Sequence, residues 1–342
     1  MQRWVAVVNP VSQEQFDNYM EGIGLCGLRN RPIAIAVSGG ADSMALTHLL
    51  HQWLGVEGRD NVHILTVDHG LRPESADEVK MVQKFAKDSG VKCRTFKWLA
   101  EKSEKSIQER ARQARYGLMS AYCQSQKIGH LFLAHHGDDQ METFLFRLAK
   151  GSGIEGLACM KPVQKFGEHL SLIRPLLTVS HANLIETCRQ AGIVWVEDLS
   201  NDSEKYMRGR MRRSRAILEQ EGLSVKRISQ LTARIERAGS LIDQIVENKE
   251  KTIIVKKDTK RIDIKLSELV SEHSEVIIRI LQRSIARLRI GENYPARLED
   301  VERLALRLTQ DGFRGATLGG VKFTPRSKED ILCLTLEQSQ KT

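Results

Sequence analysis

The sequence predicts an α/β fold with a doubly wound parallel sheet, a linking helix and a smaller C-terminal domain. Short apolar runs alternate with amphipathic helical patterns from residue 31 to about residue 190. Polar clusters follow the predicted strands, where ligands bind in such sheets. The pattern then changes near residue 224, where a long helical segment begins. We therefore expect an N-terminal extension packed on the first domain (1–30), a main α/β domain (31–222), and a linker helix with a small recognition domain (223–342).

Each expected element has a local signal. Residues 33–37 form a short apolar run rich in β-branched residues, which suits a strand buried on both faces. A helix over residues 75–89 ends at Gly90, a favourable C-cap. A helix over residues 106–126 carries apolar side chains along one side. The other expected elements are strands at residues 62–67, 91–98, 130–134, 170–173 and 193–196, and helices after residue 43 and at residues 138–149, 181–190 and 224–249.

The composition narrows the class of protein. The chain has 342 residues, 41% hydrophobic and 28% charged, enough for a large core and two domains. It shows neither an apolar run of membrane-spanning length nor a basic-then-apolar secretory pattern, so we expect a cytoplasmic protein with no membrane partner. Six scattered cysteines without C-x-x-C spacing are typical of free thiols. The net charge of +9 favours a polyanionic partner.

The most specific motif is a loop between the first strand and the helix that follows it. Its residues are Ser38, Gly39, Gly40, Ala41, Asp42 and Ser43. The two glycines let the backbone approach a phosphate closely, and the helix N-terminus and serine hydroxyls supply donors. The carboxylate of Asp42 is best used there to hold Mg²⁺. A Gly-Gly turn alone is a weak signal, and this loop matches neither G-x-x-x-x-G-K-S/T nor G-x-G-x-x-G.

A second polar segment follows the second predicted strand. Residues 68–72 read Asp-His-Gly-Leu-Arg. In this segment His69 is a candidate contact for the nucleotide. The alternative is a plain turn with solvated charges.

A cluster of acids and histidines follows the strand at residues 130–134. Residues 135–142 read H-H-G-D-D-Q-M-E, and helical spacing brings Asp138, Asp139 and Glu142 to one helix start. The helix dipole favours carboxylates there, so capping explains part of the pattern. Two histidines and three acids exceed what capping needs, which favours Mg²⁺ ligation and base chemistry. A zinc site is the alternative, although the spacing does not match H-x-x-x-H.

Two groups of cations complete the candidate site. Arg112 and Arg115 are neighbours on a helix and can clamp phosphates, although a solvated helix face is the alternative. Residues 205–215 hold six cations and no acid. Such a run repels itself unless an anion binds it, and a nucleic acid backbone fits that role better than a solvated helix. The candidate contacts in this run are Lys205, Arg208, Arg210, Arg212 and Arg213.

Taken together, these motifs resemble those of the tRNA(Ile)-lysidine synthetase family, in the N-type ATP pyrophosphatase (PP-loop) superfamily. The resemblance covers about residues 31–220, with weaker likeness up to Gly320. It implies ATP-dependent ligation of free L-lysine to C2 of the wobble cytidine of tRNA(Ile) with a CAU anticodon. An adenylated cytidine would be the intermediate, and AMP and pyrophosphate the other products. ATP and Mg²⁺ are the implied cofactors, and a homodimer is compatible with the sequence.

The resemblance also implies a role for each candidate residue. The implied ATP contacts are Ser38, Gly39, Gly40, Ala41, Asp42, Ser43 and His69. The implied catalytic residues are Asp42, Arg112, Arg115, His136, Asp138, Asp139 and Glu142. Asp42 and Asp139 are the implied Mg²⁺ ligands, and the basic run 205–213 is the implied tRNA contact.

Three other functions are compatible with parts of the pattern. A related tRNA thiolase needs paired cysteines, and the absence of C-x-x-C disfavours it. An amidotransferase needs an ammonia source, and the basic run favours RNA instead. A non-catalytic RNA-binding protein on a nucleotide fold conflicts with the intact loop at residues 38–43 and with the acidic cluster.

Overall fold

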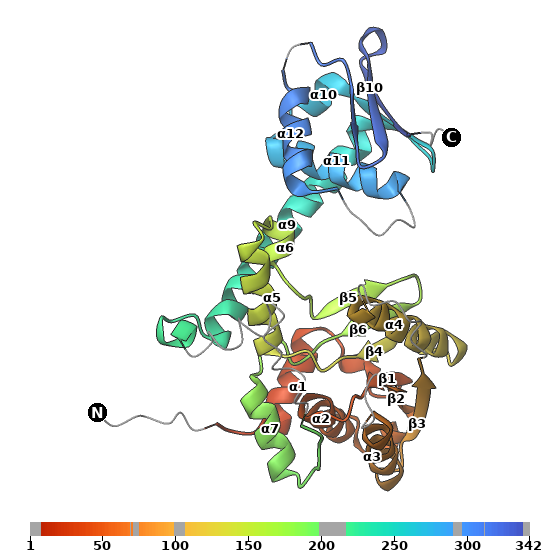
Figure 1. Cartoon of the computed structure of the whole chain (residues 1–342), viewed down its shortest axis with the longest axis vertical. Helices are drawn as coiled ribbons and strands as arrows, with labels where there is room; N and C mark the ends of the chain where they lie inside the picture. Colours follow the sequence, from red (N-terminus) through yellow and green to blue (C-terminus); the bar gives the residue numbers. More distant parts are fainter. Residues whose placement is uncertain are drawn as a thin grey trace. The chain divides into compact units, whose positions relative to one another are not determined.

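The computed structural model describes residues 8–68, 70, 75–98, 107–197, 217–289, 296–310 and 312–337. The chain forms two compact units (Figure 1). The first comprises residues 1–150 and 158–232, and the second comprises residues 151–157 and 233–342. The expected limits of the three parts, at residues 30 and 222, stay predictions.

The first unit is built on a six-stranded sheet with the order β3-β2-β1-β4-β6-β5. All neighbouring strands are parallel except β5, which runs antiparallel to β6. The strands are β1 (Ile33–Ala36), β2 (Val62–Asp68), β3 (Lys92–Lys97), β4 (His130–Phe132), β5 (Val163–Phe166) and β6 (Leu170–Ile173). The helices are α1 (Gln13–Gly22), α2 (Ala41–Gly58), α3 (Ser75–Asp88), α4 (Ile107–Ser125), α5 (Gly137–Ala149) and α7 (His181–Gln190), with short 3₁₀ helices η1 (Cys26–Leu28) and η2 (Arg59–Asn61). This architecture confirms the predicted doubly wound sheet.

Strand β1 lies at the centre of this sheet and is buried on both faces. Ile33 and Ile35 are fully buried in a core that also contains side chains of α1, α2, α3 and α7. Ala34, on the opposite face, is fully buried in a second core with side chains of α4. Because successive side chains of a strand point to opposite faces, this short apolar run is covered by helices on both sides.

Two local expectations differ from the structure. The strand predicted at residues 193–196 is wrong: residues 193–197 form no strand. Their apolar side chains Ile193 and Trp195 pack against the first core, and Val196 N–H donates to the Gly39 carbonyl (3.0 Å). Strand β5 was not predicted, because an edge strand that is mostly exposed has no continuous apolar pattern.

The second unit is a small α+β domain. Its sheet has five antiparallel strands in the order β7-β8-β11-β10-β9. The strands are β7 (Ile254–Lys257), β8 (Arg261–Lys265), β9 (Ala316–Leu318), β10 (Val321–Arg326) and β11 (Ile331–Leu336). The helices are α6 (Ile154–Leu157), α10 (Leu266–Val270), α11 (Ser274–Leu288) and α12 (Leu298–Leu308), with the 3₁₀ helix η4 (Ser327–Glu329). Helix α9 (Val225–Ile253) begins in the first unit and ends in the second.

A buried arginine joins three helices of the second unit. Arg279 of α11 is only 2% exposed. Its guanidinium donates to Glu155 of α6 and Asp243 of α9, each at 2.8 Å. It also donates to Glu275, one turn earlier in α11, at 2.8 Å. Because a buried cation is costly without partners, Arg279 holds Glu155, and with it the short helix α6, within this unit.

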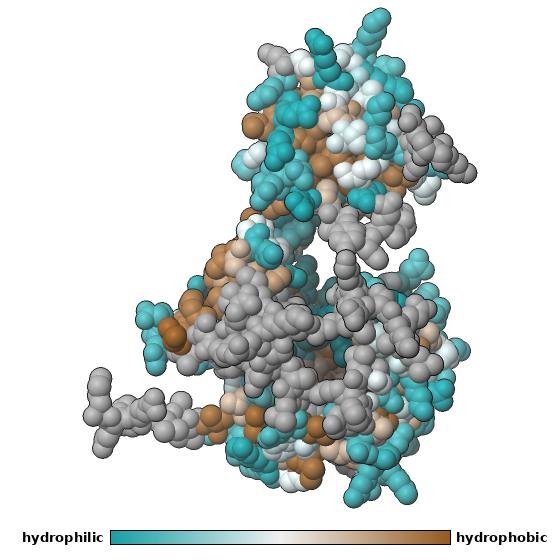
Figure 2. Space-filling view, in the orientation of Figure 1, coloured by the Kyte–Doolittle hydropathy of each residue, from teal (hydrophilic) through white to brown (hydrophobic). Residues whose placement is uncertain are grey.

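The face of the two units drawn in Figure 2 is mainly hydrophilic outside the grey regions. Figure 2 shows hydrophilic residues over most of the coloured surface, with apolar side chains in smaller groups. Among the described residues, no helix is both long enough and apolar enough to cross a membrane.

The strand order places the predicted site at one edge of the first sheet. From β1 the chain proceeds to β2 and β3 on one side, whereas β4 pairs with the other side of β1. The strand order therefore reverses between β1 and β4. Ligands in open α/β sheets bind in the crevice beyond the carboxyl ends of the strands at this reversal.

Candidate active site

The loop after β1 forms a cradle at the start of helix α2. Gly39 has a φ of +90°, which side chains rarely allow, and an added Cβ would lie 3.1 Å from Met81. The Ser43 hydroxyl donates to the Gly40 carbonyl (3.0 Å) and accepts from Ser38 N–H (3.2 Å), which closes the loop. The first N–H groups of a helix have no acceptor within it, so those of Ala41 and its neighbours are available to an anion.

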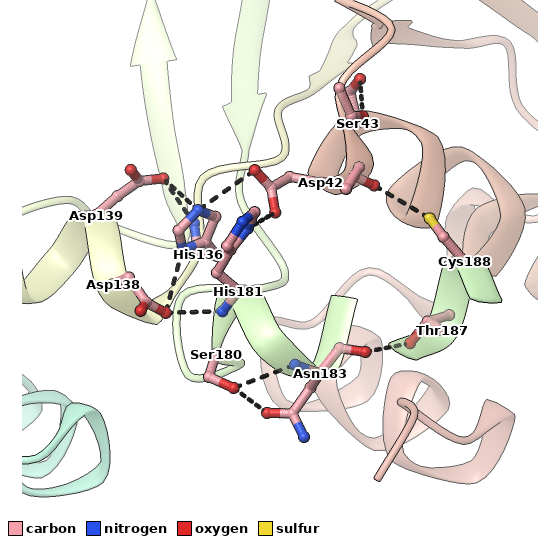
Figure 3. A network of polar contacts seen from close by, with 12 residues as sticks. Asp42, Ser43, His136, Asp138, Asp139, Ser180, His181, Asn183, Thr187 and Cys188 are labelled. Atoms are coloured by element: carbon pink, nitrogen blue, oxygen red, sulfur yellow. Dashed lines mark hydrogen bonds and ion pairs between the residues drawn. The ribbon is translucent and has the colours of Figure 1, made fainter. Parts of the chain in front are cut away.

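Asp42 lies between two imidazoles. Its Oδ1 is 2.7 Å from Nδ1 of His181, at the start of α7. Its Oδ2 is 3.4 Å from Nε2 of His136, at the carboxyl end of β4. The two rings are stacked, with centroids 5.3 Å apart (Figure 3). Three separate segments of the chain therefore meet at this carboxylate.

The two aspartates of α5 make different contacts with this group. Asp139 accepts the backbone N–H of His136 (3.1 Å), and its carboxylate is 3.6 Å from Nε2 of the same residue. Asp138 is buried, and its Oδ2 accepts the backbone N–H of His181 (2.7 Å). The same oxygen lies 3.5 Å from Nδ1 of His136. Asp138 thus joins the starts of α5 and α7 (Figure 3).

The electrostatics of this group favour a charged pair. Burial alone would raise the pKa of the Asp42 carboxyl, but hydrogen bonds to His136 and His181 and their positive charge bring it well below its usual value. Burial opposes protonation of His136, yet the hydrogen bond to Asp42 and the surrounding carboxylates raise its pKa. One of these carboxylates is Glu142, on the same helix as Asp139. The site therefore favours an ionised Asp42 beside a protonated His136.

A second cluster of cations lies around His135. The guanidinium carbons of Arg112 and Arg115 are 5.2 Å and 5.7 Å from the centroid of the Tyr116 ring. Arg174, which is 4% exposed, donates to the Lys161 carbonyl at 3.0 Å. Burial, and then the positive charge of the three arginines, lowers the pKa of His135 to about 3. A neutral imidazole among guanidiniums leaves the cluster with a strong preference for an anion.

Close packing fixes the start of α5. A Cβ added to Gly137 would lie 2.3 Å from Cγ1 of Val225, in the first turn of α9, and 2.9 Å from the Val179 carbonyl. Gly137 N–H donates to that carbonyl at 2.7 Å. On the other side of the site, the Cys188 thiol of α7 donates to the Ala41 carbonyl at 3.3 Å. These contacts fix the relative positions of the three segments that form the site, namely the starts of α2, α5 and α7.

The chain is similar to known proteins over most of its length. A family model described as a PP-loop domain matches residues 8–219. The tRNA(Ile)-lysidine synthase of Bradyrhizobium sp. (strain BTAi1) is 36% identical over 297 residues, which cover 84% of this chain and 82% of the relative. That of Methylobacterium nodulans is 34% identical over 331 residues, covering 91% and 92%.

The chain belongs to the tRNA(Ile)-lysidine synthase family of PP-loop proteins. This confirms the family that the motifs predicted. The U34-tRNA thiolase NcsA from Methanococcus maripaludis has a similar structure, with a TM-score of 0.56 at 17% identity. The match covers 66% of this chain and 79% of the thiolase. At this identity the likeness shows a shared fold.

In this lysidine synthase family member, the structure brings most of the predicted site residues together. The loop from Ser38 to Ser43 lies at the strand-order reversal beside the His136 segment. Arg112 and Arg115 form a neighbouring cluster around His135. The predicted nucleotide contact His69 lies outside the described residues, as do the predicted RNA contacts Lys205, Arg208, Arg210, Arg212 and Arg213. The individual roles of all these residues stay predictions.

Two residues of the site escaped the sequence reasoning. His181 was used only to mark a helix start, yet it makes a short contact with Asp42, 139 positions earlier. Arg174 was not among the candidate site residues, yet it is buried beside Arg112 and Tyr116. A charged residue directly after a predicted strand was the available signal for Arg174. No sequence periodicity predicts the contact of His181 with Asp42, because tertiary packing alone brings α7 to the loop.

The cysteines fit the thiolase alternative poorly. All six are free, and Cys123, Cys159, Cys188 and Cys333 are buried. Burial raises the pKa of Cys123 and Cys188 to about 12, which keeps both thiols protonated and unreactive. The Bradyrhizobium and Methylobacterium relatives are lysidine synthases, which also makes the thiolase alternative the weaker one.

Proposed function

We propose that this protein joins free L-lysine to C2 of the wobble cytidine of tRNA(Ile) with a CAU anticodon, using ATP. The cytidine O2 attacks the α-phosphate of ATP and pyrophosphate leaves. The lysine amine then attacks C2 of the adenylated cytidine, a proton is lost, and AMP leaves. One observation carries this proposal. At the strand-order reversal, Asp42 of the PP-loop contacts His136, in a chain that resembles lysidine synthases over most of its length.

The PP-loop supplies the ATP-binding part of the site. The N-terminus of α2 offers backbone donors and a favourable dipole to the phosphates. The side-chain oxygens of Asp42 and Asp139 approach Nε2 of His136 from two sides, at 3.4 and 3.6 Å. These carboxylates fit Mg²⁺, which prefers oxygen ligands and takes most of them from substrate phosphates and water. When bound with ATP, Mg²⁺ would neutralise charge on the phosphates.

The arginine cluster supplies the positive charge that adenylation needs. Arg112 and Arg115 are held over Tyr116, so their guanidiniums are ordered before substrate arrives. Negative charge grows on the phosphate oxygens as the bond to pyrophosphate breaks. Preorganised donors stabilise such charge more effectively than water does, because they need not reorient.

The acidic residues serve the second half of the reaction. A lysine amine has a pKa of about 10.4, so only about one molecule in 2,500 is neutral at pH 7. A positioned base offsets part of this deficit of roughly 4–5 kcal/mol. Glu142, and Asp139 where it does not hold Mg²⁺, are partly exposed at the start of α5, where they can bind the ammonium group or accept its proton. Asp138, the third predicted acid, is buried and orients the backbone of His181.

The first test is incorporation of radiolabelled lysine into RNA. Purified protein is incubated with Mg·ATP, labelled lysine and an unmodified tRNA(Ile) transcript with a CAU anticodon. We expect acid-insoluble label that depends on ATP and is absent with tRNA(Met). If ATP is cleaved to AMP and pyrophosphate with RNA but no lysine is joined, adenylation stands and lysine is not the nucleophile. If neither occurs, the proposal is wrong.

A further inference from the structure

We propose that Asp42, His136 and His181 form a binding site for a divalent transition-metal cation, such as Zn²⁺ or Co²⁺, when no nucleotide is bound. Each of the three offers one ligand atom, and these atoms all lie within 4.8 Å of one another. The 2.7 Å and 3.4 Å contacts between the Asp42 oxygens and the two imidazoles are close to the spacing of ligands around one small cation. A small shift of the side chains would bring all three into coordination.

The chemistry of the donors selects the class of metal. Two imidazole nitrogens and one carboxylate oxygen suit Zn²⁺, Co²⁺ and related ions. Mg²⁺ favours oxygen donors and is a poor match for this set. The proposed site therefore differs from the Mg²⁺ site of the reaction, although both would use Asp42. It goes beyond the proposed function and does not depend on it.

The surroundings of His136 also match those of a metal ligand. Its Nε2 faces Asp42, while its Nδ1 is buried and has no hydrogen-bond partner among the described residues. Nδ1 lies 3.5 Å from the carboxylate of Asp138. A histidine that binds a metal through one nitrogen usually presents the other to a carboxylate, which orients the ring. Asp138 also accepts the backbone N–H of His181, so one buried carboxylate contacts both histidines.

The site is open enough for a cation to enter and exchange. The side chains of His181 and Asp42 are 44% and 28% exposed. Three protein ligands leave at least one position for water, as in exchangeable rather than closed zinc sites. Because the cation would occupy Asp42, it would compete with Mg·ATP. We therefore expect micromolar-range Zn²⁺ to inhibit ATP cleavage reversibly, with relief by a chelator.

Cobalt provides a readout that does not need the enzyme to be active. The full-length protein, freed of metal and nucleotide, is titrated with Co²⁺, and its visible d–d absorption is followed. We expect one Co²⁺ per chain and an intense spectrum typical of four- or five-coordination, which Mg·ATP diminishes. His181→Ala and Asp42→Asn should each weaken Co²⁺ binding by at least about tenfold.

A matched control separates this site from other histidines. His48 and His51 lie three residues apart on α2, so H48Q/H51Q removes two imidazoles elsewhere and should leave the Co²⁺ spectrum unchanged. Thermal melting of every variant, including His181→Gln, checks that the fold is retained. The proposal is overturned if Co²⁺ gives no such spectrum, or if His181→Ala binds Co²⁺ as the wild-type protein does. Lysine incorporation is measured separately, so failure here does not touch the proposed function.

Discussion

The residues of the site differ in how strongly their substitution should lower activity, and we expect the largest effect at Asp42. Its carboxylate is shared by two imidazoles and belongs to the loop that faces ATP. We expect Asp42→Asn, which keeps the shape and removes the charge, to lower the rate of pyrophosphate release by at least about 100-fold. The matched control is Asp77→Asn on α3, an exposed carboxylate whose side chain is 77% accessible. Normal pyrophosphate release by Asp42→Asn would disprove the metal and phosphate role.

His63 of β2 makes stability depend on pH. It is 7% exposed, its Nδ1 lies 2.9 Å from the Tyr122 hydroxyl, and burial followed by the charge of Lys92 lowers its pKa. Below the ordinary histidine value of about 6.5 the unfolded chain takes up the proton more readily than the folded one. The contribution of neutral His63 is therefore complete above that pH and is lost as the pH falls toward the folded-state pKa.

Chemical denaturation at several pH values tests this expectation. The free energy of unfolding of His63→Gln should fall less steeply than that of wild type between about pH 7 and pH 5. The control is His169→Gln, whose side chain is 67% accessible and which should keep the wild-type slope. Equal slopes for His63→Gln and wild type would contradict the prediction.

Among the elements, α5 is the one whose placement determines the site. Its first residue, Gly137, leaves no room for a side chain beside Val225 and the Val179 carbonyl. We expect Gly137→Ala to destabilise the fold by about 1–3 kcal/mol, as overpacking does, and to reduce activity by displacing His136. Unfolding experiments and the lysine assay measure the two effects.

A second substitution tests the assigned cause. Val225→Ala removes the nearest obstructing atom, so the double variant should recover part of the stability that Gly137→Ala removes. Recovery will be incomplete, because the Val179 carbonyl still lies 2.9 Å from the new Cβ. Additive effects of the two substitutions would show that α9 does not set the space available at Gly137.

The elements also show how far sequence reasoning reaches. The helix predicted at residues 181–190 coincides with α7, and the structure shows that the Ser180 side chain caps its first turn by accepting the Asn183 N–H. Asp42 and His136 were expected at one sheet edge, because both follow parallel strands. The contact of His181 with Asp42 was not foreseeable, since packing of α7 against α2 sets it and sequence spacing carries no trace of it. Residues 193–196 show the converse: an apolar run can be buried without joining a sheet.

For the whole molecule, the net charge of +9 predicts binding to RNA that depends on salt. We expect glutamine substitutions in the basic run to weaken tRNA binding and to flatten its dependence on salt. The residues to replace are Lys205, Arg208, Arg210, Arg212 and Arg213. Every cation that pairs with a phosphate should, when replaced, lower the slope of log K against log salt by about 0.7–0.9.

A filter-binding titration at several salt concentrations measures this slope. The control is the double variant Lys84→Gln/Lys87→Gln, which removes two exposed cations from α3. That pair should change the slope less than any two substitutions within the basic run. An unchanged slope for the fivefold variant would show that the RNA backbone lies elsewhere.

The division of the chain into units has a consequence for recombination between relatives. The second unit takes residues 151–157 from the middle of the sequence as well as residues 233–342. A crossover near residue 232 would therefore transfer only part of this module. The recipient would keep its own Glu155, whose carboxylate would then have to pair with the Arg279 guanidinium of the donor protein. Functional chimaeras of such proteins should require a double exchange, in which the short insert travels with the C-terminal segment that surrounds it.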